Sequence, residues 1–445
     1  MGHLSFLTRA EIEELGPPTP EDLEETGVSD ALLHDLALKY VATLADATSA
    51  LVAEKVHLPC VLIEEILYSL YREKLIEMRL QSALGVTRYA MLDSGWERLL
   101  VLETHNGYRG PAPVSLADYT YMIRLQAAPS KPASIDAIRS IFSDLVLPDS
   151  LLQTLGCVIN SRSSLFLTGP SGSGKTAVCE RMSAALSGSI WIPHAIEVDG
   201  QIIRIYDSNY HHAVEKDRAK LEHDRRWVEI ERPLIMVGGE LKLDNASLTW
   251  SESAKYYDAP FQIKANGGTL VIDDFGRQSA SPRDLLNRWI HPLERRVDFL
   301  TLSNGKKIEV PFEQLVVFST NLEESILDEA FLRRVGYRAR VEMPTSSAYI
   351  EIFKRAASAK GIKLGEGTLD HVLGKYGEEG RPMKSCEPRD LLNRVNELCL
   401  FEGRPLRLTP ELIDLAWRNY FGVTHSFDSH ASKLAAARQG SAMAI

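Results

Sequence analysis

The sequence predicts a mixed α/β fold with a mainly helical region on either side of it. Short apolar runs at Leu165–Leu167, Thr269–Ile272 and Leu315–Phe318 are typical of strands buried on both faces, as in a parallel sheet. Residues 30–45 carry apolar side chains at helical spacing, and beyond Thr345 the pattern is helical up to about Phe421. Buried strands that alternate with helices in the middle of the chain favour a parallel sheet flanked by helices.

Composition limits the classes of protein to which this chain can belong. The 445 residues are 44% hydrophobic and 25% charged, as in a globular protein of two or three domains. No segment resembles a signal peptide, and no apolar run approaches the roughly 18 residues of a membrane helix. We therefore expect a cytoplasmic protein without membrane insertion. The five scattered cysteines form no C-x-x-C pair, which argues against a disulfide framework and against a zinc site.

Changes in composition divide the chain into six parts. We expect an acidic N-terminal arm at 1–27, a mainly helical domain at 28–126, a linker rich in Pro and Ala at 127–135, an α/β core at 136–344, a helical lid at 345–422 and a flexible tail at 423–445.

The domain at 28–126 contains three helical segments, at 30–45, 48–56 and 61–80. The residues that follow, up to Leu99–Leu102, form either a β-wing or a helix and then a strand. Three helices and a wing resemble a winged helix-turn-helix. Residues 1–130 hold 10 Lys/Arg and 19 Asp/Glu, a formal balance of −9, which is poorly suited to binding a phosphate backbone.

The clearest motif follows the run at Leu165–Leu167. It fills every fixed position of the phosphate-binding loop G-x-x-x-x-G-K-[ST] and leads into a helix; its residues are Gly169, Pro170, Ser171, Gly172, Ser173, Gly174, Lys175 and Thr176, followed by Ala177. The glycines let backbone N–H groups turn toward phosphates, Lys175 supplies a positive charge, and the Thr176 hydroxyl is placed to bind Mg²⁺. The motif predicts binding of a nucleoside triphosphate, ATP, with Mg²⁺.

Polar residues follow the next two strands. Asp273 and Asp274 come directly after Thr269–Ile272, in the arrangement of a Walker B motif, where the first carboxylate holds Mg²⁺ and the second polarises the attacking water. Two acids in a surface turn are the alternative. Asn321 ends the strand that begins at Leu315, where it can reach the γ-phosphate; an N-cap of the next helix is the other interpretation.

Three arginines complete the pattern. Arg333 and Arg334 stand at the end of a predicted helix, 328–335, and Arg389 stands at the start of a helix in the C-terminal region. Taken in this order, the motifs resemble the AAA+ ATPases over residues 136–422.

This resemblance implies roles for the residues beyond the phosphate-binding loop. Asp274 and Asn321 would act in ATP hydrolysis, Arg333 or Arg334 would be an arginine finger that projects into a neighbouring subunit, and Arg389 would be sensor 2. The resemblance thus implies an ATPase that works as a homo-oligomeric ring, expected to be a hexamer. The sequence departs from the usual Asp-Glu pair, because Asp274 stands where a Glu is usual. The Asp side chain is shorter than that of Glu by about 1.5 Å, so we expect hydrolysis to be slow unless the backbone compensates.

Two hairpins are predicted from their turns, at Asp199-Gly200 and at Asn304-Gly305. The second lies just before the strand that ends in Asn321. That placement resembles the pre-sensor 1 β-hairpin branch of AAA+ proteins, which includes enhancer-binding activators and the chelatase/MoxR remodellers. Tyr256 and Tyr257 are either aromatic residues that grip a substrate in a ring pore or core residues.

These inferences favour a chaperone-like remodeller of a protein partner, which the acidic N-terminal domain would recruit. A DNA-linked regulator or motor is the second hypothesis, less favoured because of the charge of residues 1–130. A scaffold that binds ATP and scarcely hydrolyses it is the third, because Asp274 is short.

Overall fold

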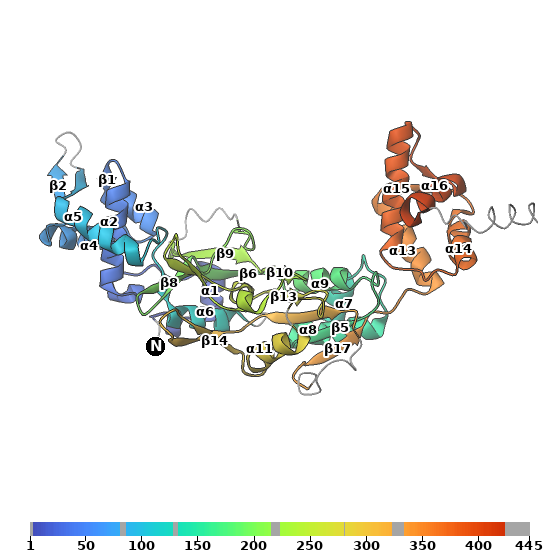
Figure 1. Ribbon diagram of the computed structural model, residues 1–445, viewed down its shortest axis with the longest axis horizontal. Coiled ribbons are helices and arrows are strands. Elements are labelled where there is room, and N and C mark those ends of the chain that lie inside the picture. Colours follow the sequence, from blue (N-terminus) through green and yellow to red (C-terminus); the bar gives the residue numbers. More distant parts are fainter. Residues whose placement is uncertain are drawn as a thin grey trace, which may run out of the picture. The chain divides into compact units, whose positions relative to one another are not determined.

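The computed structural model describes residues 3–80, 86–127, 132–214, 223–279, 281–322 and 333–422 (Figure 1). The chain divides into two compact units. The first comprises Met1–Phe142, Leu147–Thr168 and Lys175–Arg340, and the second comprises Ser143–Val146, Gly169–Gly174 and Val341–Ile445. The predicted tail at 423–445 and most of the predicted helix at 328–335 lie outside the described residues.

The N-terminal arm is packed into the first unit. It contains η1 (His3–Phe6), α1 (Arg9–Leu15) and η2 (Glu24–Thr26). Thr8 and Glu11 form a capping box that starts α1. Leu4 and Ile12 are buried in the same hydrophobic cluster as residues of the later strands. Although it is acidic, the arm therefore contributes to the core.

Three helices and a small antiparallel sheet follow the arm. The elements are α2 (Asp30–Thr43), β1 (Ala47–Thr48), α3 (Ser49–Val56), α4 (Cys60–Arg72), β2 (Ile76–Leu80), β3 (Thr87–Met91) and α5 (Asp93–His105). The strand order is β1-β3-β2. The predicted helices at 30–45 and 48–56 are confirmed to within two residues at each end.

The predicted helix at 61–80 is wrong beyond Arg72. Lys74 adopts a left-handed backbone with φ 57°, and the Leu75 N–H donates to the Leu70 carbonyl at 3.0 Å, which closes the helix as a Schellman motif does. The chain then continues as β2, whose residues pair with β3. Leu99–Leu102, for which a strand was one expectation, is helical and belongs to α5.

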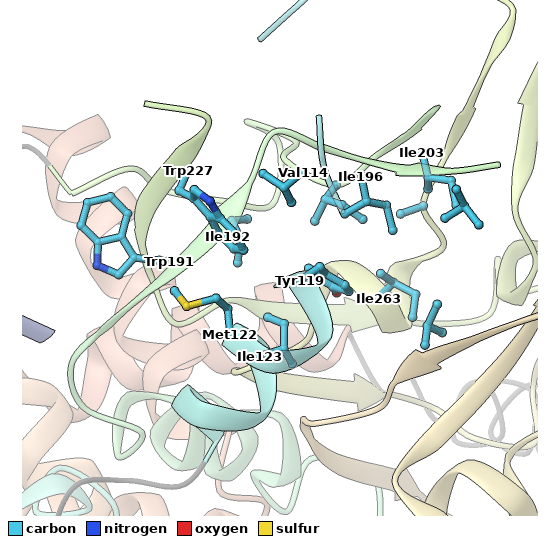
Figure 2. Packing of buried hydrophobic residues seen from close by; sticks show 14 of the residues in the cluster. Val114, Tyr119, Met122, Ile123, Trp191, Ile192, Ile196, Ile203, Trp227 and Ile263 are labelled. Carbon is cyan, nitrogen blue, oxygen red and sulfur yellow. The ribbon is translucent and has the colours of Figure 1, made fainter. Parts of the chain in front are cut away.

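A second sheet is formed by strands that alternate along the chain with those of the central sheet. Its strand order is β11-β12-β8-β7-β4, with bounds β4 (Val114–Ser115), β7 (Ala195–Val198), β8 (Gln201–Arg204), β11 (Thr249–Ser251) and β12 (Tyr256–Asp258). β6 (Ser189–Pro193) and β9 (Trp227–Glu231) form a separate antiparallel pair. α6 (Leu116–Ala127) packs on these strands, and Figure 2 shows its Tyr119, Met122 and Ile123 facing the cluster that includes Ile192 and Trp227.

The hairpin predicted at Asp199-Gly200 is confirmed. Val198 of β7 pairs with Gln201 of β8, and the two turn residues have φ values of 51° and 75°, as a primed turn requires. The first arm of the hairpin begins at Ala195, because His194 separates β7 from β6.

The central sheet is parallel and five-stranded, so the expected α/β fold class is confirmed. Its order is β10-β13-β16-β5-β17, with bounds β5 (Leu165–Thr168), β10 (Leu234–Val237), β13 (Thr269–Ile272), β16 (Leu315–Thr320) and β17 (Tyr337–Arg340). The flanking helices are α7 (Ile135–Ile141), α8 (Asp149–Ser161), α9 (Lys175–Ala184), the short α10 (Phe261–Lys264) and α11 (Pro282–Arg295) (Figure 1).

The second predicted hairpin is also confirmed, as β14 (Val297–Thr301) and β15 (Lys307–Pro311). Its turn is not a two-residue turn, since only Gly305 has a positive φ, 82°. The tip is fastened to the second sheet. The Tyr257 hydroxyl accepts from the Ser303 N–H at 2.7 Å and bonds the Ser303 hydroxyl, and Lys306 pairs with Asp199 of the other hairpin.

In the second unit, the C-terminal part of the chain is a helical bundle with its own core. It contains α13 (Ser346–Ala359), α14 (Thr368–Glu379), α15 (Glu387–Glu402) and α16 (Pro410–Phe421), with the two-residue strands β18 (Lys363–Leu364) and β19 (Arg407–Leu408). Apolar residues of all four helices, among them Phe353, Val372, Leu391 and Trp417, share one buried cluster.

Candidate functional site

Four of the predicted site residues meet at one edge of the central sheet. Lys175 and Thr176 open α9, Asp273 follows β13, and Asn321 follows β16. The Thr176 hydroxyl donates to Asp273 Oδ2 at 3.0 Å, and Lys175 Nζ donates to Asn321 Oδ1 at 2.5 Å. Neighbouring parallel strands bring their carboxyl ends to the same edge, which explains why residues 97 and 146 positions apart come together.

The lysine is the buried member of this group. Lys175 is only 8% exposed. Burial lowers the pKa of its ammonium group, while Asp273 and Asp274 partly oppose that shift by stabilising the charge. An ammonium group that is poorly hydrated gains most from anionic oxygens placed against it. The arrangement is therefore suited to a bound phosphate.

Thr176 and Asp273 supply the oxygen ligands that Mg²⁺ prefers. Their side chains already lie within hydrogen-bond distance of each other, so one hydroxyl and one carboxylate face a common point. Among the described residues, no group of three His, Cys, Asp or Glu side chains is arranged to hold a metal. Mg²⁺ does not need such a cage, because it keeps several waters and binds substrate phosphates as well. The residues present fit the ion.

The glycine-rich residues that precede Lys175 belong to the second unit. Gly169, Gly172 and Gly174 have φ values of 151°, 83° and 101°, which residues with a side chain rarely adopt. The Gly172 carbonyl accepts from the Cys386 N–H at 3.3 Å, and a Cβ at Gly172 would lie 2.9 Å from Cδ of Lys384. The loop thus has the backbone that its motif requires, and it rests on the start of the α15 segment.

Asp274 lies in the turn after β13 and is exposed. Its backbone has φ 48°, and its carboxylate lies 3.7 Å from Arg277 Nη1. The second carboxylate of the pair therefore points to a different partner from the first, which contacts Thr176.

The three predicted arginines, Arg333, Arg334 and Arg389, are exposed. Arg334 Nε lies 3.3 Å from Glu294 of α11. Arg333 precedes β17 in a turn, not in a helix. Arg389 lies on α15 of the second unit, with Nε 3.3 Å from Asp390.

The aromatic residues considered for a pore are packed into the protein. Tyr257 is 2% exposed and holds the tip of the β14–β15 hairpin. The Tyr256 ring packs edge-on against Tyr108 at 5.5 Å and lies under the Arg204 guanidinium. The core interpretation of this pair is the correct one.

Sequence reasoning missed two parts of the site. β10 was not predicted, although the apolar run Leu234–Val237 was available as a signal. Gln278, which hydrogen-bonds the turn after β13, carried no signal at all, because its partners are carbonyl groups that only the folded chain brings together.

A cleft of the first unit lies elsewhere. It has a volume of about 1020 Å³ and is lined by α3, β6 and β9, including His57, Trp191, His194 and Trp227. It holds none of the predicted site residues. Within the described part of the chain, no helix is long and apolar enough to cross a membrane.

Comparisons with known proteins give limited similarity. A family model described as a domain of unknown function (DUF8689) matches residues 345–419. No curated protein matches this chain. Among solved structures, NtrX from Brucella abortus in complex with ATP is similar with 17% identity and a TM-score of 0.38, covering 59% of this chain. The match spans 54% of the NtrX chain, about half its length.

Two structures of RuvB from Thermotoga maritima are also similar. A mutant matches with 13% identity and a TM-score of 0.37, covering 66% of this chain and 76% of RuvB. A structure described as a Holliday junction branch migration motor matches with 16% identity and a TM-score of 0.34, covering 64% and 71%. TM-scores this low do not assign a fold by themselves, and the strand order described above is the stronger observation.

Proposed function

We propose that this protein is a Mg²⁺-dependent ATPase of the AAA+ type. One observation carries the proposal: Lys175 and Thr176, which follow a complete phosphate-binding loop, contact Asn321 and Asp273 at the ends of two adjacent parallel strands. The sheet order β10-β13-β16-β5-β17 supports it, because the loop-bearing strand β5 lies between the strand of Asn321 and the last strand of the sheet.

Each residue of the site has a role in this proposal. The loop N–H groups and Lys175 bind the phosphates, and Thr176 and Asp273 hold Mg²⁺, which neutralises phosphate charge when it is bound. Asp274 orients the attacking water, and Asn321 senses the γ-phosphate.

Steady-state hydrolysis and nucleotide binding test the assignment. Asp273→Asn keeps the size of the side chain and removes the charge that holds Mg²⁺, so we expect ATP binding to persist and hydrolysis to be lost at every Mg²⁺ concentration. Asp46→Asn, at an exposed aspartate in the N-terminal domain that pairs with Arg88, is a matched loss of one carboxylate outside the site. Wild-type turnover by the Asp273→Asn protein would refute the proposal.

We also propose that the active form is a homo-oligomeric ring in which Arg333 or Arg334 completes a neighbour's site. Both arginines are exposed, as residues that reach another subunit must be. Specific activity should then rise cooperatively with protein concentration, and mixing in the Arg333→Ala or Arg334→Ala protein should inhibit the wild type. Activity that is strictly proportional to concentration would count against a ring.

For the N-terminal region, we propose a winged helix that recruits a protein partner for remodelling. The order of α2, β1, α3, α4, β2 and β3 supports this interpretation. The exposed side chains of α4 include Val61, Glu64, Glu65 and Tyr68, with Arg72 at its end. A face with two carboxylates and a single arginine is poorly suited to the phosphate-lined groove of DNA and better suited to another protein.

A DNA-linked regulator or motor is the second candidate, because winged helices often bind DNA. Titration of the full-length protein with duplex DNA at low salt distinguishes the two. Sub-millimolar affinity that falls steeply with salt would favour the DNA-linked function over the protein remodeller. The third candidate, a scaffold with slow turnover, depends on Asp274 and is addressed by the variants of that residue below.

A further inference from the structure

The turn that carries both aspartates has a backbone that needs support. Asp274 adopts φ 48°, in the left-handed region that is costly for residues with a Cβ. Its N–H donates to Asp273 Oδ1 at 2.9 Å, and the Phe275 N–H donates to the Ser319 carbonyl of β16 at 2.8 Å. These contacts hold the N–H groups of the turn, and a side chain holds its carbonyl groups.

That side chain is Gln278, which is only 8% exposed. Its Nε2 lies 3.1 Å from the Asp273 carbonyl oxygen, 3.3 Å from that of Asp274 and 3.3 Å from that of Gly238, just beyond β10. Its Oε1 accepts from the Gly276 N–H at 2.7 Å. One amide therefore joins the end of β10 to the turn after β13.

The chemistry of an amide is needed at this position. The two Nε2 hydrogens are shared among three carbonyl oxygens, while Oε1 satisfies one N–H. A carboxylate keeps the acceptor and loses both donors, and an apolar side chain of equal length loses all of these bonds. The Asp274 and Gly238 carbonyls each keep a backbone donor, from Arg277 and Leu241, but the Asp273 carbonyl loses its described donor and would be drawn toward water.

We propose that Gln278 is a positioning residue that fixes the Asp273–Asp274 turn in the geometry required for ATP hydrolysis. The inference rests on the proposed function. Among the residues that the structure describes, Gln278 bonds backbone groups alone, so it acts through the two aspartates. Thr176 and Lys175 reach the site from α9, which Gln278 does not contact through any described hydrogen bond. Nucleotide binding is therefore separable from its effect.

The first test compares Gln278→Glu and Gln278→Met in the full-length protein. We expect the affinity for ATP to stay within about threefold of wild type, because the phosphate-binding loop is unchanged. We expect kcat to fall about 10- to 100-fold, the loss typical of a catalytic group displaced by about 1 Å. Steady-state kinetics give kcat and KM, and fluorescence titration with a labelled ATP analogue gives the affinity.

The pH profile supplies a readout that a merely structural role would not move. In the Gln278→Glu protein, protonation of the introduced carboxyl gives back one O–H donor toward the carbonyl oxygens. Burial favours that neutral form. The ratio of its kcat to that of wild type should rise as the pH falls from about 8 to about 6. The same ratio for Gln278→Met should stay flat.

Gln262→Met is the matched control. Gln262 is fully buried, and its Nε2 donates to the Ala246 carbonyl at 2.7 Å and to Asp298 at 3.1 Å, so its loss destabilises the protein without touching the turn. We expect a lowered melting temperature with wild-type kcat. If both Gln278 variants have the kcat of wild type, or if their affinity for ATP falls in proportion to kcat, this inference is wrong and the proposed function still stands. If the wild-type protein does not hydrolyse ATP, both the proposed function and this inference are wrong.

Discussion

The ammonium group of Lys175 donates a hydrogen bond of 2.5 Å to the side-chain amide oxygen of Asn321. The two residues stand 146 positions apart, at the start of α9 and just beyond the end of β16. In this arrangement a neutral oxygen satisfies the lysine. A phosphate oxygen, which is charged, would be a stronger acceptor. Under the proposed function, Asn321 would therefore hold the lysine until the nucleotide replaces it.

Removal of the lysine should weaken nucleotide binding. A hydrogen bond to a charged group contributes about 1.5–3 kcal/mol, so Lys175→Ala should lower the affinity for ATP about 10- to 100-fold. Titration with a fluorescent ATP analogue measures this. Lys360→Ala removes an exposed lysine just beyond α13 and should leave the affinity unchanged. Equal affinities for the Lys175→Ala and wild-type proteins would contradict the site.

The second aspartate allows a test that preserves the backbone. Asn tolerates the left-handed conformation that Asp274 adopts, so Asp274→Asn should fold normally. The loss of the carboxylate should lower kcat about 10²- to 10⁴-fold, the usual contribution of a general base. Asp274→Glu extends the carboxylate and should raise kcat. If Asp274→Asn hydrolyses ATP as fast as wild type, the residue has no catalytic role.

The Tyr257 hydroxyl helps to hold the tip of the β14–β15 hairpin. Tyr257→Phe leaves the Ser303 N–H without the acceptor it has at 2.7 Å. Ser303 is exposed, so water can partly replace this acceptor; a hydrogen bond contributes about 0.5–1.5 kcal/mol net, and denaturant unfolding should show a loss in that range. Tyr68→Phe, on the exposed face of α4, should change the free energy of unfolding by less than about 0.5 kcal/mol. Equal stabilities of the two variants would refute the role of Tyr257.

Stability should depend on pH through His194. Burial, with the neighbouring His57 ring 5.3 Å away, lowers the pKa of His194 to about 4. His194 binds a proton more readily in the unfolded chain than in the folded one. The contribution of the neutral His194 side chain to the free energy of unfolding is therefore complete above pH about 6.5 and is lost as the pH falls toward 4.

Urea unfolding at several pH values between about 7 and about 4 measures this contribution. His194→Gln should flatten the profile, while His105→Gln, exposed at the end of α5, should not. A profile that is the same with and without the His194 side chain would exclude this cause.

The central sheet and most of the site were predictable because parallel strands buried on both faces leave apolar runs, and residues such as Asp273 and Asn321 follow them directly. The end of α4 was not predictable, since Ile76–Leu80 carries apolar residues that fit a helix as well as a strand. Pairing with β3, made possible by the left-handed Lys74, decides between them. The contacts of Gln278 could not be predicted for a similar reason, because its partners follow two different strands, β10 and β13.

The contact between Gly172 and Cys386 joins the phosphate-binding loop to the C-terminal helices. The phosphate-binding loop shares a compact unit with the C-terminal helices, and an amide of the α15 segment holds one of its carbonyl groups. A protein shortened to end at residue 340 would keep the whole motif and lose that support. Under the proposed function, a fragment that binds nucleotide would therefore have to extend through α16, because the C-terminal helices support the loop that carries the motif.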